Sequence, residues 1–179
     1  MGNSKIEHFC WLDLEMTGLD VNKDKILEIA ILVTDKYFNE KGRFHNYVFQ
    51  PDEVLKEMNP WCKKQHKASG LLEKVRQGIA LTTLEEEIPI FLNSFFQPED
   101  SIVLCGNSIG QDRKFVEKYL SKFSSRLHYR MLDVSSFKIL FEERYAIKFK
   151  KANSHLAMDD ILESIEELKY YMKSICPSE

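Results

Sequence analysis

Three apolar stretches follow one another closely in the first 49 residues of the chain. They span residues 8–14, 26–35 and 43–49, and each is rich in the aliphatic, β-branched or aromatic residues that favour β-strands. The turn-forming residues 39–42 separate the second stretch from the third, which predicts an antiparallel hairpin. A chain that begins in this way is restricted to folds with a β-sheet at their centre.

After this meander, helical and strand patterns alternate, which predicts an α/β fold with a mixed β-sheet flanked by helices. The order of elements does not by itself determine the topology. We expect short helices within 52–78, a helix from about 82 to 96, a strand at 101–106, a helix at 111–122, a short strand at 130–133 followed by a helix to 145, and a last helix at 156–173.

Two details of these helices are also predicted. Thr82 and Thr83 each precede a glutamate by three residues, the pattern of a capping box at a helix start, and Pro89 indicates a kink farther on. The last helix has an apolar stripe at helical spacing. Its members are Ile161, Leu162, Ile165, Leu168 and Met172.

Length and composition indicate one globular domain over residues 1–179, with 44% hydrophobic and 30% charged residues. No apolar run reaches membrane-spanning length, and the N-terminus has no leader pattern, so we expect a cytoplasmic protein without membrane contact. The four cysteines lack metal-binding spacing and are interpreted as buried thiols. A net charge of -3 disfavours a grip on a long polyanion, so any nucleic-acid ligand should be short or should be met by bound cations.

Asp13 and Glu15 are the first candidates for chemistry. Residues two apart on a strand share one face, so both carboxylates point the same way and Leu14 points to the other face. Two anions held close in apolar surroundings repel each other unless a cation joins them, and oxygen ligands favour Mg²⁺ or Mn²⁺. The alternative is a solvated strand end.

Further acids occur at the starts of two predicted helices. Asp112 lies in the first turn after a glycine-containing loop, where an acid commonly caps the helix or complements its dipole. His155 precedes Asp159 and Asp160, and a histidine beside a metal-binding acid is a candidate general base. Spacing leaves open which of these two acids is the ligand, and both could instead serve the helix dipole.

Four segments of the sequence resemble the exonuclease motifs of oligoribonucleases, within the DEDDh group of 3′–5′ exonucleases. Residues 11–20 (WLDLEMTGLD) resemble the first motif and residues 107–113 (NSIGQDR) the second. Residues 129–136 (YRMLDVSS) and 155–165 (HLAMDDILESI) resemble the remaining signatures. The motifs occur in the family's order, and the resemblance extends from about residue 8 to residue 172.

The resemblance implies a ribonuclease H-like fold and hydrolysis of very short RNA, dinucleotides above all, from the 3′ end to nucleoside 5′-monophosphates. It also implies two divalent ions, Mg²⁺ or Mn²⁺, about 4 Å apart. The family pattern selects Asp160 over Asp159 and gives His155 the role of general base. The implied catalytic residues are Asp13, Glu15, Asp112, His155 and Asp160, with the four acids as metal ligands.

The same resemblance implies contacts to the substrate and a homodimer. Leu19 corresponds to a wedge between two bases, and Trp61 and His66 to base contacts, although both have the alternative of ordinary packing. The implied 5′-phosphate cap consists of Ser108, Arg130 and Ser135, with Tyr129 supplied by a second subunit. Arg130 has the alternative of a surface ion pair. The chain departs from many family members in having Leu156 instead of arginine after the histidine.

Three rival interpretations remain open at this point. A related exonuclease could trim longer single strands, and product profiles on different chain lengths would distinguish it. A nucleotide-binding module with a decayed site would have no need of His155 and would show no turnover. A purely structural role for the acids predicts no stabilisation by divalent metal on heating.

Overall fold

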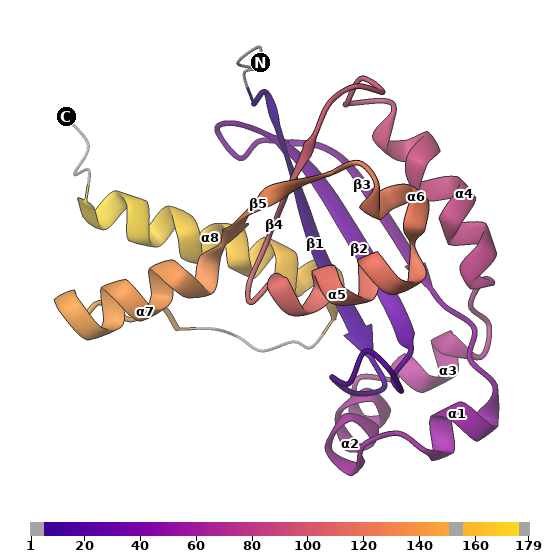
Figure 1. The fold of residues 1–179 in the computed structure, drawn as a ribbon. Helices are drawn as coiled ribbons and strands as arrows, with labels where there is room; N and C mark the ends of the chain where they lie inside the picture. The colour runs from indigo at the N-terminus through magenta and orange to yellow at the C-terminus, as the bar shows by residue number, and fades with distance from the viewer. Residues whose placement is uncertain (1–5, 151–155, 176–179) are drawn as a thin grey trace.

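Five strands form one mixed sheet at the centre of the molecule. They are β1 (His8–Met16), β2 (Ile26–Asp35), β3 (Glu40–Tyr47), β4 (Ile102–Gly106) and β5 (Leu127–Asp133). The computed structural model describes residues 6–150 and 156–175. The sheet order is β3-β2-β1-β4-β5, with β2 antiparallel to both β1 and β3, β4 parallel to β1, and β5 parallel to β4 (Figure 1). The predicted α/β class with a mixed sheet is confirmed.

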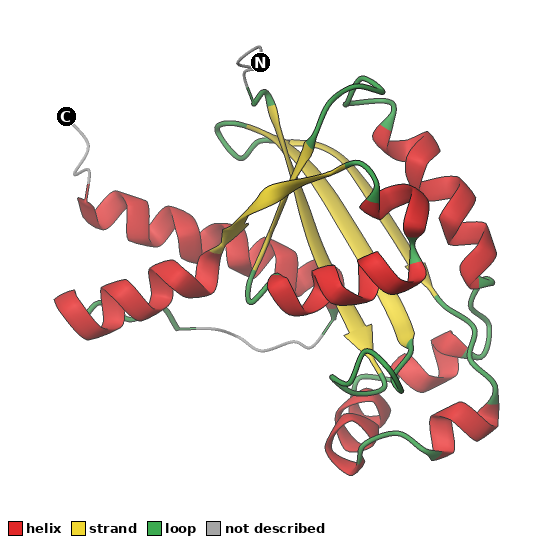
Figure 2. Cartoon of the chain, viewed as in Figure 1, coloured by secondary structure: helices red, strands yellow, loops and turns green. Residues whose placement is uncertain are grey.

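Eight helices surround this sheet in the part of the chain that the structure describes (Figure 2). They are α1 (Asp52–Lys56), α2 (Pro60–Ala68), α3 (Leu71–Val75), α4 (Leu81–Leu92), α5 (Gly110–Tyr119), α6 (Ser121–Ser124), α7 (Val134–Tyr145) and α8 (Ala157–Ile175). Helices α1, α2 and α3 lie together beyond the end of β1. None of the described helices is both long and apolar enough to cross a membrane.

The two faces of the sheet have separate apolar cores. On one face Leu12 and Leu14 of β1 pack with α4, α5 and α6. On the other face Trp11 packs with Ala30 of β2 and with Ile161 of α8. Since alternate residues of a strand point to opposite faces, β1 contributes to both cores and is buried between two layers of helices.

The hairpin between β2 and β3 is confirmed, but its turn lies earlier than predicted. The Asp35 carboxylate accepts hydrogen bonds from the backbone N–H groups of Tyr37 and Asn39, and Phe38 adopts a left-handed φ of 64°. Gly42 is therefore a strand residue opposite Val33 and not part of the turn. A side chain at Gly42 would collide with the Phe95 ring, so close packing explains a glycine that had indicated a turn.

The capping-box prediction for α4 is wrong. The helix begins at Leu81 after Ala80, which makes no side-chain cap, and it ends at Leu92, earlier than expected. Glu85 does not bond back to the helix start, because its Oε1 accepts from Ser121 Oγ at 2.5 Å and from the Lys122 N–H at 2.9 Å. A tertiary contact with α6 thus replaced the local one.

The apolar stripe of α8 is confirmed only in part. Ile161, Ile165 and Leu168 are buried, whereas Leu162 and Met172 are 38% and 47% exposed. Tyr171 occupies the core instead, where its hydroxyl donates to buried Glu167. The buried face of α8 is therefore narrower than its apolar stripe. It also includes polar groups, which are hydrogen-bonded to each other.

Candidate active site

Asp13 and Glu15 lie on one face of β1 near its C-terminal end, as predicted. Leu14 between them points into the opposite core. Beyond Trp11 the apolar packing under α8 gives way to these two acids, because α8 begins at this level of the sheet. The strand therefore presents a pair of carboxylates where a helix N-terminus approaches it.

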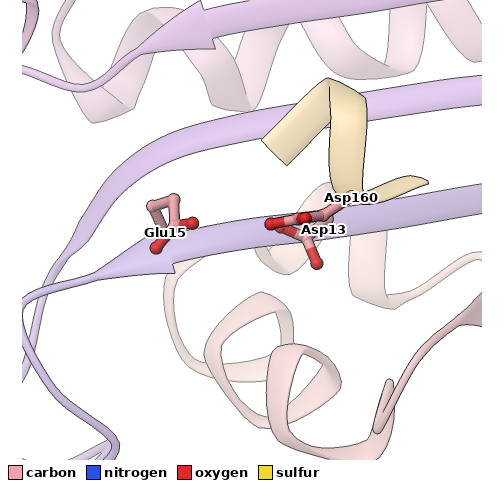
Figure 3. A group of neighbouring side chains, drawn as sticks. All are labelled: Asp13, Glu15 and Asp160. Atoms are coloured by element: carbon pink, nitrogen blue, oxygen red, sulfur yellow. The ribbon is translucent and has the colours of Figure 1, made fainter. Parts of the chain in front are cut away.

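Asp160 in the first turn of α8 completes a compact group with these two acids (Figure 3). One carboxylate oxygen from each of Asp13, Glu15 and Asp160 lies within 4.8 Å of the others. Asp159 is exposed and is not a member of this group. The structure thus brings Asp160, and not its neighbour, to the strand carboxylates.

Asp112 reaches the same region from α5. Its Oδ1 accepts a hydrogen bond of 3.0 Å from the Leu14 N–H of β1, and the side chain is buried. At the end of β4 the chain passes close to β1 through Gly106, since a Cβ there would lie 2.7 Å from the Leu12 carbonyl oxygen. Asp112 therefore binds the strand that carries the other acids, while Ile109, the N-cap residue of α5, makes no side-chain cap.

The acids are held in a setting that opposes their ionisation. Burial, followed by the charges of Asp112, Glu15 and Asp160, raises the pKa of Asp13 well above its usual range. Burial, followed by the charges of Asp160 and Glu28, raises the pKa of Glu15 to about 8. Burial raises the pKa of Asp112 to about 7, although the Leu14 N–H works against this shift.

A divalent cation fits this arrangement. It would offset the repulsion among carboxylates that are close together and partly desolvated. The donors of the compact group are oxygen atoms alone, which suits hard ions such as Mg²⁺ and Mn²⁺ better than zinc. The described residues therefore include an acidic group able to hold a divalent metal.

His155, the predicted general base, lies outside the described residues. Leu156, which stands where many family members have arginine, precedes α8 and is half-buried. The described residues that follow begin α8, whose first turn brings Asp160 to the strand carboxylates.

Two of the predicted base contacts lie open to solvent at this end of the molecule. Leu19 is 69% exposed and Trp61 is 61% exposed. The Leu19 carbonyl accepts a hydrogen bond of 2.7 Å from Gln111 Nε2 of α5, and the Trp61 N–H donates to Asn59 Oδ1 at the start of α2. Each apolar side chain is thus presented outward from an anchored backbone.

His66, the third predicted base contact, is buried. Its Nε2 lies 2.9 Å from the Met16 carbonyl oxygen, to which it must donate, and its Nδ1 lies 3.8 Å from Glu15 Oε2. The carbonyl thus orients the ring so that the other nitrogen faces Glu15. His66 is therefore placed against a carboxylate of the site as well as near Trp61 in sequence.

Two residues of the predicted phosphate cap share one anchor. Asp133 Oδ1 accepts from the Ser108 N–H at 2.9 Å and from the Ser135 hydroxyl at 2.7 Å. This holds Ser108 in a left-handed conformation with φ 54°. Tyr129 and Arg130 lie on the edge strand β5, exposed, with the guanidinium 5.2 Å from the tyrosine ring.

Sequence reasoning missed Glu28 of β2. It stands opposite Glu15 in the strand register and is only 1% exposed. Its Oε1 lies 2.6 Å from His45 Nε2, and its charge contributes, after burial and Asp160, to the raised pKa of Glu15. A lone acid within the otherwise apolar run of residues 26–33 was the available signal.

Comparison with known proteins places the chain in a nuclease family. Residues 10–168 match the exonuclease family RNase_T, and the chain belongs to this family. The structure is similar to that of Escherichia coli exonuclease I in a zinc-bound complex with single-stranded DNA, with a TM-score of 0.72 at 16% identity. That match covers 97% of this chain but only 42% of the exonuclease I chain, and it shows the fold alone.

The most informative relatives by sequence are oligoribonucleases. The chain is 45% identical to oligoribonuclease from Francisella tularensis over 172 residues, which cover 94% of this chain and 96% of that protein. It is 43% identical to mitochondrial oligoribonuclease from Homo sapiens over 97% of this chain and 76% of that protein. The predicted resemblance to oligoribonucleases is confirmed, and the chain is a nuclease of the hydrolase class.

Proposed function

We propose that this chain is a 3′–5′ exoribonuclease that hydrolyses very short oligoribonucleotides, especially dinucleotides, to nucleoside 5′-monophosphates. The observation that carries the proposal is the group of carboxylate oxygens from Asp13, Glu15 and Asp160 within 4.8 Å of one another, in a chain whose relatives are oligoribonucleases. We further propose that the whole of residues 1–179 acts as a single exonuclease domain.

The proposed chemistry uses two divalent ions, Mg²⁺ or Mn²⁺. When bound, such ions polarise the scissile phosphate and lower the pKa of the attacking water. Asp13, Glu15 and Asp160 would hold the cations, and buried Asp112 would support the site from α5 while it fixes β1 through the Leu14 N–H. His155 accepts the proton of the attacking water, which is worth about 10²–10⁴-fold in rate for a general base.

The substrate contacts that we propose fit a short ligand. Exposed Leu19 inserts between two bases, and a base stacks on exposed Trp61, with His66 close by. Ser108, Arg130 and Ser135 bind the 5′ phosphate, and Asp133 supports this role by holding both serines. A cap at the 5′ end would block the binding of a longer strand. The net charge of -3 agrees with this, because proteins that bind long nucleic acids usually need many basic residues.

We propose that the active form is a homodimer. The edge strand β5 exposes Tyr129 and Met131, and the neighbouring helix α7 exposes Ile139 and Leu140. Exposed apolar side chains next to an unpaired strand edge favour association with a second copy. In such a dimer Tyr129 extends to the phosphate cap of the partner subunit. Action in the cytoplasm remains a prediction of the sequence.

The test compares hydrolysis of a 5′-phosphorylated diribonucleotide with that of a 5′-phosphorylated 20-mer in Mn²⁺. Wild type should convert the dinucleotide much faster, and Asp160→Ala should be inactive, whereas Asp159→Ala, a control at the adjacent exposed acid, should remain active. Preference for the 20-mer would replace the short-substrate proposal with an exonuclease that trims longer strands. Absence of turnover on both would favour a nucleotide-binding module.

Salt dependence provides an independent check on substrate length. Because few phosphates of a dinucleotide are engaged, the affinity should fall only shallowly with increasing salt concentration. A steep dependence, which indicates many ion contacts, would contradict the proposed short substrate. The measurement is the KM for the dinucleotide across a range of KCl concentrations.

A further inference from the structure

Glu28 is a buried carboxylate that the proposed chemistry has not used. Its side chain is 1% exposed, and one oxygen, Oε1, lies 2.6 Å from His45 Nε2. The other oxygen, Oε2, is buried and has no hydrogen-bond partner among the described residues. Burying a carboxylate oxygen without a hydrogen-bond donor costs free energy, so we expect a donor or a cation near this atom.

The register of the sheet directs Glu28 toward the carboxylate group. Glu28 and Glu15 are opposite each other on β2 and β1, so their side chains lie side by side on the same face. The charge of Glu28 is also among the causes that raise the pKa values of Asp13 and Glu15, after burial and the acids of the group itself. The buried oxygen is therefore part of the surroundings of the site.

Glu28 is nevertheless too far away to be a ligand of the same ion. The group whose oxygens all lie within 4.8 Å of one another contains Asp13, Glu15 and Asp160 and does not include Glu28. A hydrated ion bridges such a gap, because Mg²⁺ and similar ions keep several bound waters whose hydrogens need acceptors. Glu28 Oε2 can accept such a hydrogen bond, since it has no partner among the described residues and Glu28 lies directly opposite Glu15 on the neighbouring strand.

We propose that Glu28 is a positioning residue of the metal site, whose Oε2 accepts a hydrogen bond from water on the ion held by Asp13, Glu15 and Asp160. His45 fixes the orientation of this carboxylate through Oε1. The T-shaped packing of the His45 ring on Tyr47, with centroids 4.8 Å apart, in turn fixes His45. The inference rests on the proposed metal-dependent function and extends it to two residues of β2 and β3.

The test measures Mn²⁺ binding to the full chain by isothermal titration calorimetry, without any substrate. Glu28→Gln keeps the size of the side chain and removes its charge, and it should weaken Mn²⁺ binding about 10–100-fold, the usual cost of losing an outer partner of a metal site. Glu85→Gln is the matched control. Glu85 also has a buried Oε2 without a partner among the described residues, but it bonds to α6, so its variant should bind Mn²⁺ as wild type does.

A second pair of variants keeps the inference testable if Glu28→Gln does not fold. His45→Phe removes the bond to Oε1 and should weaken Mn²⁺ binding, whereas His45→Gln keeps a donor and should retain more of the affinity. Equal Mn²⁺ affinity in wild type and Glu28→Gln would overturn the inference and leave Glu28 as a structural partner of His45. Absence of Mn²⁺ binding to wild type would overturn the proposed metal-dependent function itself, and this inference with it.

Discussion

The two faces of β1 differ sharply although they belong to the same nine residues. Cys10, Leu12 and Leu14 form a continuous apolar row in one core. On the opposite face Phe9 and Trp11 pack in the core under α8, and the carboxylates of Asp13 and Glu15 follow them along the strand. The first face is apolar along the whole strand and stabilises the fold. On the second face only the first half of the strand packs in a core, and the second half carries the carboxylates.

The apolar face of β1 compensates for the electrostatic repulsion among the carboxylates on the other face. The carboxylate end repels itself, as the raised pKa values of Asp13 and Glu15 show, each caused first by burial and then by neighbouring acids. The apolar row on the reverse face holds the backbone in place against that repulsion. Changes on the two faces of β1 should therefore have opposite consequences for stability and activity.

The largest expected effect is on activity at the carboxylate face. Asp13→Asn should lower kcat/KM for a diribonucleotide by at least about 10³-fold, because a lost metal interaction costs several kcal/mol of transition-state stabilisation. The melting temperature in metal-free buffer should rise, since a buried like charge is removed. If Asp13→Asn instead melted at a lower temperature and lost activity only through unfolding, the two faces of β1 would not differ in the way that we propose.

The next effect concerns stability on the apolar face. Leu12 is almost fully buried, and Leu12→Ala should lower the free energy of unfolding by about 2–5 kcal/mol. The folded fraction should keep nearly the wild-type kcat, because Leu12 points away from the acids. Urea denaturation combined with activity at low temperature measures both quantities. A specific loss of kcat in fully folded Leu12→Ala would show that the two faces are coupled.

The pH dependence of stability gives a smaller contrast. The folded state holds the Glu15 proton more tightly than the unfolded state does, since its pKa is raised from 4.5 to about 8. Ionisation therefore destabilises the fold, and in EDTA the free energy of unfolding should fall as pH rises from about 4.5 to about 8. Saturating Mn²⁺ should reduce this fall, and Glu15→Gln should flatten it. If neither Mn²⁺ nor Glu15→Gln changed the slope of the free energy of unfolding against pH, ionisation of Glu15 would not be the cause of the pH dependence.

The smallest effect is expected on α8, which covers the apolar half of the mixed face. Leu162→Ala should change the free energy of unfolding by no more than about 0.5 kcal/mol, because Leu162 is 38% exposed and belongs to none of the buried apolar clusters. Ile161→Ala, one residue earlier, should cost about 2–5 kcal/mol. Thermal or urea unfolding of the pair measures the difference. Similar costs for both residues would mean that Leu162 is covered in the active form, for example by a second subunit.

Local patterns predicted the elements well, and they were wrong where contacts between elements decided the outcome. The span of β2 agrees with its apolar run, because strand propensity and alternation are properties of neighbouring residues. Gly42 indicated a turn but lies in β3, because Phe95 packs where a side chain would stand. Glu85 indicated a cap of α4 but bonds to α6. In each case a partner distant in sequence replaced the local one.

The same distinction holds for the candidate active site, where some positions follow from local sequence patterns and others depend on contacts between distant elements. The shared face of Asp13 and Glu15 follows from the two-residue period of a strand, and the sequence motifs around them are sufficient to indicate the family. The choice of Asp160 followed from the family pattern and not from spacing.

Only the tertiary structure placed Asp112 on the Leu14 N–H and Glu28 beside Glu15. Those positions depend on strand register and on how α5 meets the sheet. Register and helix docking are set by the packing of residues far apart in the chain, which no local period encodes.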